Sequence, residues 1–256
     1  MAGPFLDRYL AGDSLGVWTE LLTLGPAVRS STSAEDAYAV ARETMQRVRR
    51  NLDVIHARLL QLGYRFQEPE AAVVPPPTAT GALLKEIERL LGPLPLSLRV
   101  FYEVVGSVDL RQSLDQITRK AWPERAREPE LSQLGDNDPL QVFPIQDLHK
   151  QACRRHTVAG DTPPRLYFCW AVDEYHKSHY SGGENYHVWL PDPAADFRIE
   201  GMYEIDEYFV EYLRATFAFG GFRGYVETLP DDDQRCRKVA PPLQIIQPLA
   251  ADLLPI

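Results

Sequence analysis

The chain has 256 residues, of which 45% are hydrophobic and 25% are charged, and its formal net charge at pH 7 is −9. This composition is ordinary for a soluble globular protein with a substantial core. The negative charge argues against a protein that binds nucleic acid over its whole surface, because phosphate contacts need clustered Lys and Arg, and it favours a basic or neutral partner.

The chain shows neither membrane nor secretory features. No run approaches the ~18 apolar residues that a membrane span needs, and "MAGPFLDRYLAGDSLG" lacks the basic start and apolar core of a signal peptide. We therefore expect a cytoplasmic protein that does not bind membranes. Cys153, Cys169 and Cys236 are odd in number, widely spaced and without a C-x-x-C pair, so we expect reduced, mainly structural thiols and no cysteine zinc site.

A long helix is predicted over residues 33–62. Ser33 and Asp36 have the spacing of a capping box, and Gly63 supplies a stop. Apolar residues recur between them at spacings of three and four: Tyr38, Ala41, Met45, Val48, Leu52, Ile55, Leu59 and Leu62. This heptad seam either packs against other elements of the same chain or makes the protein a dimeric scaffold, a homodimer joined through this helix.

Three consecutive prolines, Pro75 to Pro77, mark residues 67–80 as a stiff linker. It divides a helical N-terminal segment, residues 1–66, from a main domain over residues 81–228. The main domain begins with two short helices, "ALLKEIERLLG" and "LPLSLRVFYEVVG", and a strand that starts at Ser107. Residues 229–256 are expected to form an extended, proline-broken tail.

Three strands are predicted at "DPLQVFP", "PRLYFCWAV" and "ENYHVWLP", because aromatic and β-branched residues fill them and turn-forming residues end them. "FRIEGMYE" is a weaker strand candidate, and "IDEYFVEYLRATFAFGGF" is predicted as a helix that Gly220 and Gly221 end. The order of elements predicts an α+β fold with a mainly antiparallel sheet flanked by helices and a helical N-terminal segment.

Residues 173–191, "DEYHKSHYSGGENYHVWLP", are the chemically richest part of the chain. His176, His179 and His187, completed by Asp173 or Glu174, could bind zinc as part of a metal-dependent hydrolase. A nucleophile at Ser181 or Cys169 is a weaker alternative, because a cysteine within "LYFCWAV" is expected to be buried. The glycine motifs of nucleotide-binding folds and the G-x-S-x-G of hydrolases are missing, so we expect no catalytic residue, no metal and no cofactor.

Four blocks of the chain have an order typical of one known family. "GPLPLSLRVFYEVVGSVDL", "DPLQVFP", "VDEYHKSHYSGGENYHVWLPDPAADF" and "FVEYLRATFAFGGFRG" resemble the successive blocks of the SUKH superfamily over about residues 81–225. That superfamily includes bacterial immunity proteins against polymorphic toxins and yeast cell-wall synthesis regulators. The usual Asn-Gly turn of the first block is replaced by Gly106-Ser107. The resemblance implies an α+β domain that binds another protein and has no catalytic activity.

We therefore predict a non-catalytic protein-binding module, an immunity protein whose partner is a co-encoded toxin domain. The expected contact surface is the polar loop between the second and third strands, since exposed loops on a rigid sheet often carry recognition. Its partner-binding residues are Asp173, His176, Lys177, His179, Ser181, Gly182 and Gly183.

Overall fold

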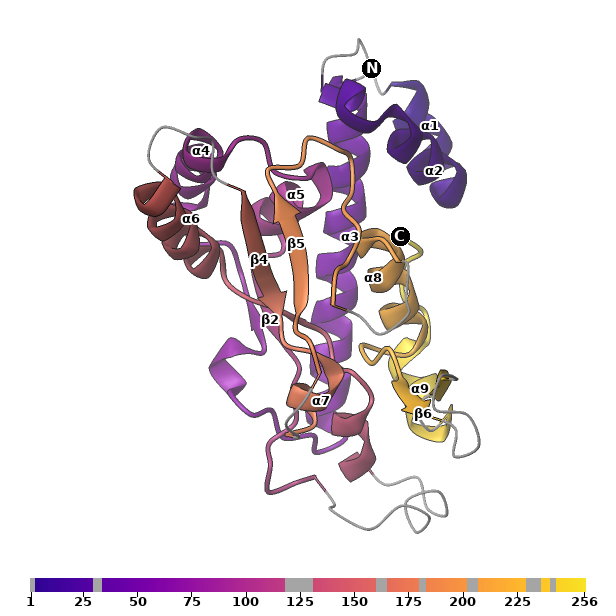
Figure 1. The fold of residues 1–256 in the computed structure, drawn as a ribbon. Helices are drawn as coiled ribbons and strands as arrows, with labels where there is room; N and C mark the ends of the chain where they lie inside the picture. The colour runs from indigo at the N-terminus through magenta and orange to yellow at the C-terminus, as the bar shows by residue number, and fades with distance from the viewer. Residues whose placement is uncertain are drawn as a thin grey trace.

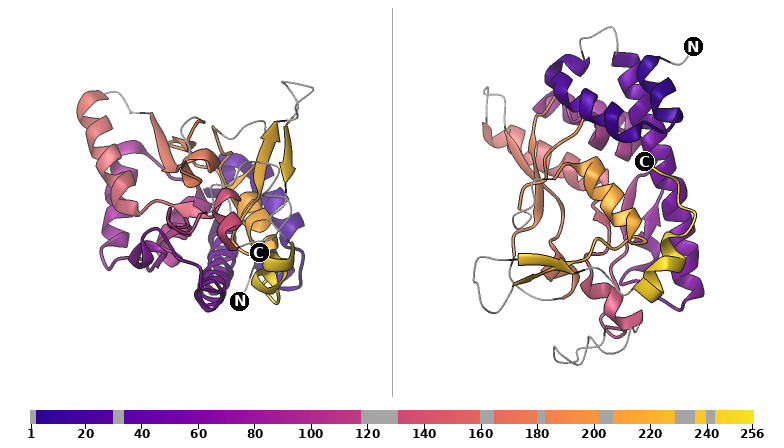
Figure 2. Two further views of the ribbon diagram at one scale, coloured as in Figure 1. Left: turned by 90° about the horizontal axis from the view of Figure 1, so that it is seen from below. Right: turned by 90° about the vertical axis from the view of Figure 1, so that its right-hand side faces the viewer.

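The structure is a computed structural model, and it describes residues 3–29, 34–117, 131–159, 165–179, 183–201, 207–228, 236–239 and 243–256. Figures 1 and 2 show a long helix, α3, that runs through the molecule, with the N-terminal helices at one end and the strands beside it. No helix in the described ranges is long and apolar enough to cross a membrane.

The N-terminal segment consists of α1 (Pro4–Leu10), α2 (Ser14–Leu24), a 3-10 turn η1 (Gly25–Arg29) and α3 (Ala34–Gln61). Ser33 of the expected capping box lies outside the described residues. Asp36, its expected partner, accepts hydrogen bonds from the backbone N–H groups of Phe5 at 2.7 Å and Leu6 at 3.1 Å. Asp36 thus caps α1, whose first N–H groups have no partner within their own helix.

The heptad seam of α3 packs within the chain. Six of its eight residues are fully buried: Ala41, Met45, Val48, Leu52, Ile55 and Leu59. The helix contacts α1 on one side and α5 (Leu96–Val104) on another. The seam is therefore occupied in the monomer, which removes the observation that favoured a homodimer joined through this helix.

The C-terminal residues also lie along α3. This part of the tail was predicted to be extended, but it contains the helix α9 (Leu243–Ala250), and Figure 2 shows the C-terminus beside α3. The Asn51 amide donates to Leu254 O at 2.9 Å and accepts from Leu254 N at 2.8 Å. Arg58 Nη1 donates to Ala251 O at 2.6 Å, and Arg47 Nη1 to Pro255 O at 2.9 Å. The tail is thus held through its backbone.

Three small antiparallel sheets form within the described residues. The first has the order β1-β2-β3 and consists of β1 (Val73–Val74), β2 (Ser107–Asp109) and β3 (Gln141–Val142). β1 comes from the segment predicted as a linker and precedes its three prolines. The second pairs β4 (Leu166–Ala171) with β5 (Tyr186–Leu190), and the third pairs β6 (Tyr225–Thr228) with β7 (Cys236–Val239). Phe143 N donates to Trp170 O at 2.8 Å, which links the first two sheets.

The remaining helices are α4 (Thr80–Leu91), α6 (Ile145–Ala159), α7 (Glu174–Lys177) and α8 (Phe209–Ala218), with 3-10 turns η2 (Pro69–Ala71) and η4 (Leu131–Asp136). The α6 helix was not predicted, although Ile145, Leu148 and Ala152 are buried at helical spacing. It packs against α4 (Figure 1). One continuous core joins the N-terminal helices to the first two sheets and to α9. The predicted α+β class is confirmed.

Candidate functional site

The segment 173–191 forms a helical turn and a strand, where only a loop and a strand were expected. Asp173 starts α7: its Oδ1 accepts from Tyr175 N at 2.8 Å and from His176 N at 3.1 Å. A carboxylate in this position satisfies N–H groups that the first turn of a helix leaves free. Ser181 and Gly182 lie outside the described residues.

Two of the predicted partner-binding residues are buried. The side chains of Asp173 and Lys177 are 3% and 0% exposed, because the capped turn directs both into the protein. Lys177 Nζ lies 2.5 Å from Asp138 Oδ1 and 4.6 Å from the centre of the Tyr186 ring. The prediction that these two side chains present themselves to a partner was therefore wrong: they support the surface from below.

Lys177 belongs to a buried ionic cluster, which we define as Asp138, Glu174, Lys177 and Tyr186. The Tyr186 hydroxyl lies 3.2 Å from Asp138 Oδ2 and 3.2 Å from Glu174 Oε2. Burial, followed by the nearby Asp138 carboxylate, raises the pKa of Glu174 from 4.5 to about 7. A protonated Glu174 is neutral, so the cluster then holds one anion and one cation, which lowers the cost of burying it.

The three histidines proposed as zinc ligands make separate contacts. His176 Nδ1 bonds to the Asp173 carboxylate, and His179 Nε2 donates to Gln112 O at 3.1 Å. His187 Nδ1 donates to Asn185 O at 2.5 Å, and partial burial lowers the pKa of the His187 ring. Within the described ranges these histidines form no group able to hold a metal ion, so the alternative of a hydrolase with this ligand set has no geometric support.

Gly183 and Cys169 have structural explanations. Gly183 has a φ of +88°, and a Cβ there would lie 2.7 Å from Asp173 Oδ1, so the turn requires glycine. Burial raises the pKa of the Cys169 thiol to about 11. A thiol that stays protonated at neutral pH is a poor nucleophile.

The outer side of the β4–β5 hairpin carries a row of aromatic rings. Tyr167 stacks on His187 with a centroid distance of 4.1 Å and an interplanar angle of 5°, and its ring centre lies 4.5 Å from that of Trp189. Arg165 lies 4.9 Å above Trp189. Trp189 is 43% exposed, whereas the inward residues of the same strands, such as Phe168 and Val188, are buried.

Carboxylates border one end of this row. The Tyr167 hydroxyl donates to Glu184 Oε1 at 3.2 Å, and the backbones of His187 and Glu200 are paired. Partial burial and the charges of Glu184 and Glu200 raise the pKa of Tyr167 to about 12. We name this surface the hairpin face and define it by Arg165, Tyr167, Glu184, His187, Trp189 and Glu200.

Comparison with known proteins gives no match: no family model, no curated protein and no solved structure is similar to the chain.

The hairpin face was missed at the level of sequence because both sides of β4 and β5 carry aromatic residues. Alternation in "RLYFCWA" and "NYHVWL" assigns Tyr167, His187 and Trp189 to one side and Phe168, Trp170 and Val188 to the other. Nothing in the two strands alone says which side the core covers.

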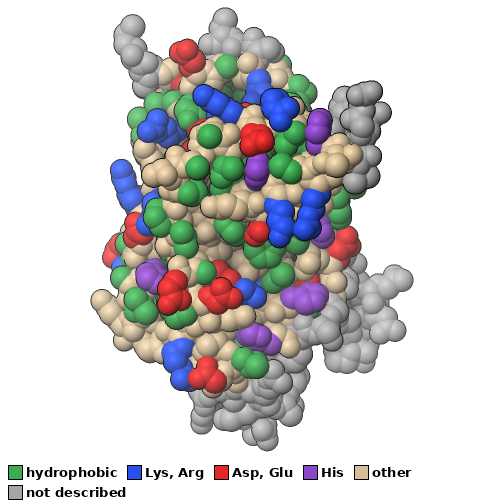
Figure 3. Space-filling model, turned by 90° about the vertical axis from the view of Figure 1, so that its left-hand side faces the viewer, with side chains coloured by type: hydrophobic (Ala, Val, Ile, Leu, Met, Phe, Trp, Pro, Cys, Tyr) green, Lys and Arg blue, Asp and Glu red, His purple; other side chains and the backbone are tan. Residues whose placement is uncertain are grey.

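On a neighbouring side of the molecule, acidic and basic side chains lie among one another with histidines between them (Figure 3). The described residues visible there therefore form no patch of one charge sign.

Proposed function

We propose that this protein is a protein-binding module without catalytic activity and that the hairpin face is its contact surface. The observation that carries the proposal is the row of Tyr167, His187 and Trp189 beside Arg165, in which Trp189 is 43% exposed and the other two rings are half-buried. Trp, Tyr and Arg are the residues most enriched in the energetic centres of protein interfaces. Trp and Tyr bury large areas with few rotatable bonds, and Arg adds charge and several hydrogen-bond donors.

The charges of this surface favour a partner with Lys or Arg side chains. Glu184 and Glu200 border the aromatic row, and the whole chain has a net charge of −9. A basic side chain that approaches Tyr167 would meet both an aromatic ring and carboxylates. His176, His179 and Gly183 lie at the end of the hairpin and stay in the proposal as its edge, while Asp173 and Lys177 hold that edge in place.

We further propose the more specific function of an immunity protein, with a cytoplasmic toxin domain as its partner. The order of the SUKH-like blocks supports this proposal, and the α+β layout agrees with what the resemblance implies. A cytoplasmic location is compatible with Cys153 and Cys169, which form no disulfide.

The test uses the full chain on beads to capture partners from a lysate of its host. Trp189→Ser and Glu184→Lys should each lose a stoichiometric basic protein that the wild type retains. Leu15→Ser and Glu70→Lys are the matched controls, since both positions are exposed and lie away from the hairpin. A partner that all four variants retain would contradict the proposed surface, and the absence of any captured protein would contradict the binding function.

The immunity function makes a separate prediction. The captured partner should stop growth when it is expressed alone in a test host, and co-expression of the wild-type chain should restore growth. Restoration should be weaker with Trp189→Ser than with Leu15→Ser. A partner that is harmless on its own would contradict immunity but leave protein binding intact.

A further inference from the structure

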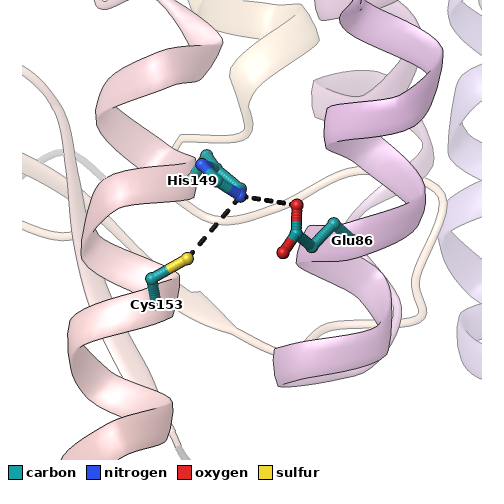
Figure 4. A group of neighbouring side chains, drawn as sticks. All are labelled: Glu86, His149 and Cys153. Carbon is teal, nitrogen blue, oxygen red and sulfur yellow. Dashed lines mark hydrogen bonds and ion pairs between the residues drawn. The ribbon is translucent and has the colours of Figure 1, made fainter.

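A second cluster, away from the hairpin face, brings together three side chains that ligate metals. Glu86 projects from α4, and His149 and Cys153 project from successive turns of α6 (Figure 4). Their ligand atoms all lie within 4.8 Å of one another. Among the described residues, these three side chains form the one group of His, Cys, Asp or Glu whose ligand atoms lie close enough together to hold a metal ion.

His149 Nε2 contacts the ligand atoms of both other side chains. His149 Nε2 lies 2.9 Å from Glu86 Oε2 and 3.6 Å from Cys153 Sγ. The nitrogen carries either one hydrogen or one lone pair. If Nε2 carries the hydrogen, it donates to the Glu86 carboxylate, and the Cys153 sulfur is at most a weak second acceptor. If Nε2 carries the lone pair, it can accept from the thiol, but the lone pair then points at the negatively charged carboxylate. An ion placed between the three atoms would attract all of them at once.

The two distances that involve His149 Nε2 are close to those around a tetrahedral ion. Zn–S and Zn–N bonds of about 2.3 and 2.0 Å at the tetrahedral angle place sulfur and nitrogen about 3.5 Å apart, and Zn–N and Zn–O bonds place nitrogen and oxygen about 3.3 Å apart. The observed separation of His149 Nε2 and Cys153 Sγ, 3.6 Å, is close to the first value. To reach the nitrogen–oxygen value from the observed 2.9 Å, Glu86 Oε2 would withdraw from His149 Nε2 by about 0.4 Å, and the Glu86 side chain is 46% exposed and can adjust.

We infer that Glu86, His149 and Cys153 form a binding site for a divalent transition metal ion, Zn²⁺, that joins α4 to α6. One thiolate, one imidazole and one carboxylate are a borderline-soft set that suits Zn²⁺ better than Mg²⁺ or Ca²⁺. Three protein ligands leave a fourth position. Because the Glu86 and His149 side chains are partly exposed, water or another small ligand can fill it.

The test is a titration of reduced, chelator-treated full-length protein with Co²⁺, whose thiolate charge-transfer absorption reports a sulfur ligand directly, followed by displacement with Zn²⁺. The wild type should saturate at about one equivalent, and Zn²⁺ should remove the band and raise the melting temperature. Cys153→Ala should abolish the band, and His149→Gln should weaken binding at least about tenfold. Cys169→Ala is the matched control and should behave as the wild type.

Circular dichroism of each variant separates loss of a ligand from loss of the fold. The inference is overturned if the wild type takes up no Co²⁺, if the charge-transfer band persists in Cys153→Ala, or if His149→Gln binds as tightly as the wild type. None of these results bears on the hairpin face, because no residue is shared between the two sites.

Discussion

Lys177→Met should destabilise the fold by about 3–5 kcal/mol, the usual cost of removing one partner of a buried ion pair. The ammonium group is 0% exposed and lies 2.5 Å from Asp138 Oδ1. Methionine has a similar length and can still pack on Tyr186, but it leaves the Asp138 carboxylate buried without the Lys177 cation. The Tyr186 hydroxyl, 3.2 Å from Asp138 Oδ2, is a neutral donor. Against a typical total of about 5–15 kcal/mol, this loss is a large fraction of the stability.

Urea unfolding followed by circular dichroism measures this loss. With a slope of about 2–3 kcal/mol per molar urea, the midpoint should fall by about 1–2 M. Lys85→Met is the matched control: Lys85 is exposed on α4, so its loss should change stability by no more than about 0.5 kcal/mol. The double variant Asp138→Asn with Lys177→Met should recover part of the stability, because no uncompensated charge remains.

A loss below about 1 kcal/mol for Lys177→Met would refute the reasoning, since it would mean that water or another cation reaches Asp138. Partner binding gives the complementary result. If Lys177 acts only as a support, its substitution should lower affinity and stability together, whereas Trp189→Ser should lower affinity alone.

Three further predictions concern buried or strained positions. The pKa of Glu174 is raised from 4.5 to about 7, so the folded state keeps a proton that the unfolded state releases, and the free energy of unfolding falls as pH rises from about 4.5 to 7. Glu174→Gln should reduce that fall by on the order of 2–3 kcal/mol, measured by urea unfolding at several pH values. A pH profile of stability that is the same in the variant and the wild type would contradict this prediction. Asp196, whose pKa burial also raises to about 7, adds a fall of the same sign that the variant should retain. Gly183→Ala should cost at least about 1 kcal/mol of thermal stability, because its φ is +88°; an unchanged melting temperature would show that the turn relaxes. Asn51→Ala should cost about 2 kcal/mol, from two lost hydrogen bonds to Leu254, and should speed hydrogen exchange at the Leu254 amide; unchanged protection there would show that the tail is held by other contacts.

The sequence predicted elements whose pattern is local. The heptad seam predicted residues 33–62, and α3 occupies Ala34–Gln61. Gly220 and Gly221 were expected to end a helix, and both follow α8 with positive φ. In each case, spacing or a glycine within one element was enough, because the backbone conformation depends on neighbours a few residues away.

Elements that depend on distant partners were predicted less well. Whether Lys177 is exposed depends on Asp138, which lies 39 residues earlier and accepts a hydrogen bond from its ammonium group in the core. The α6 helix was missed because Gln146, Lys150 and Arg154 make its sequence look polar, and its apolar side is narrow. The cluster of His149 and Cys153 with Glu86 also went unnoticed, since a four-residue spacing becomes informative only once the helix is known.

The attachment of residues 251–256 to α3 has a consequence for synthesis of the chain. Asn51 and its partner Leu254 are 203 residues apart. At about 5–20 residues per second, a ribosome needs roughly 10–40 s to make the intervening chain. During that time the side of α3 that later binds the tail has no cover, and Ile246 and Leu249, which enter the core with α9, have not been made. A nascent chain of this protein therefore presents an incomplete apolar surface until residues 243–256 have been made, and this is the interval in which a chaperone would protect it.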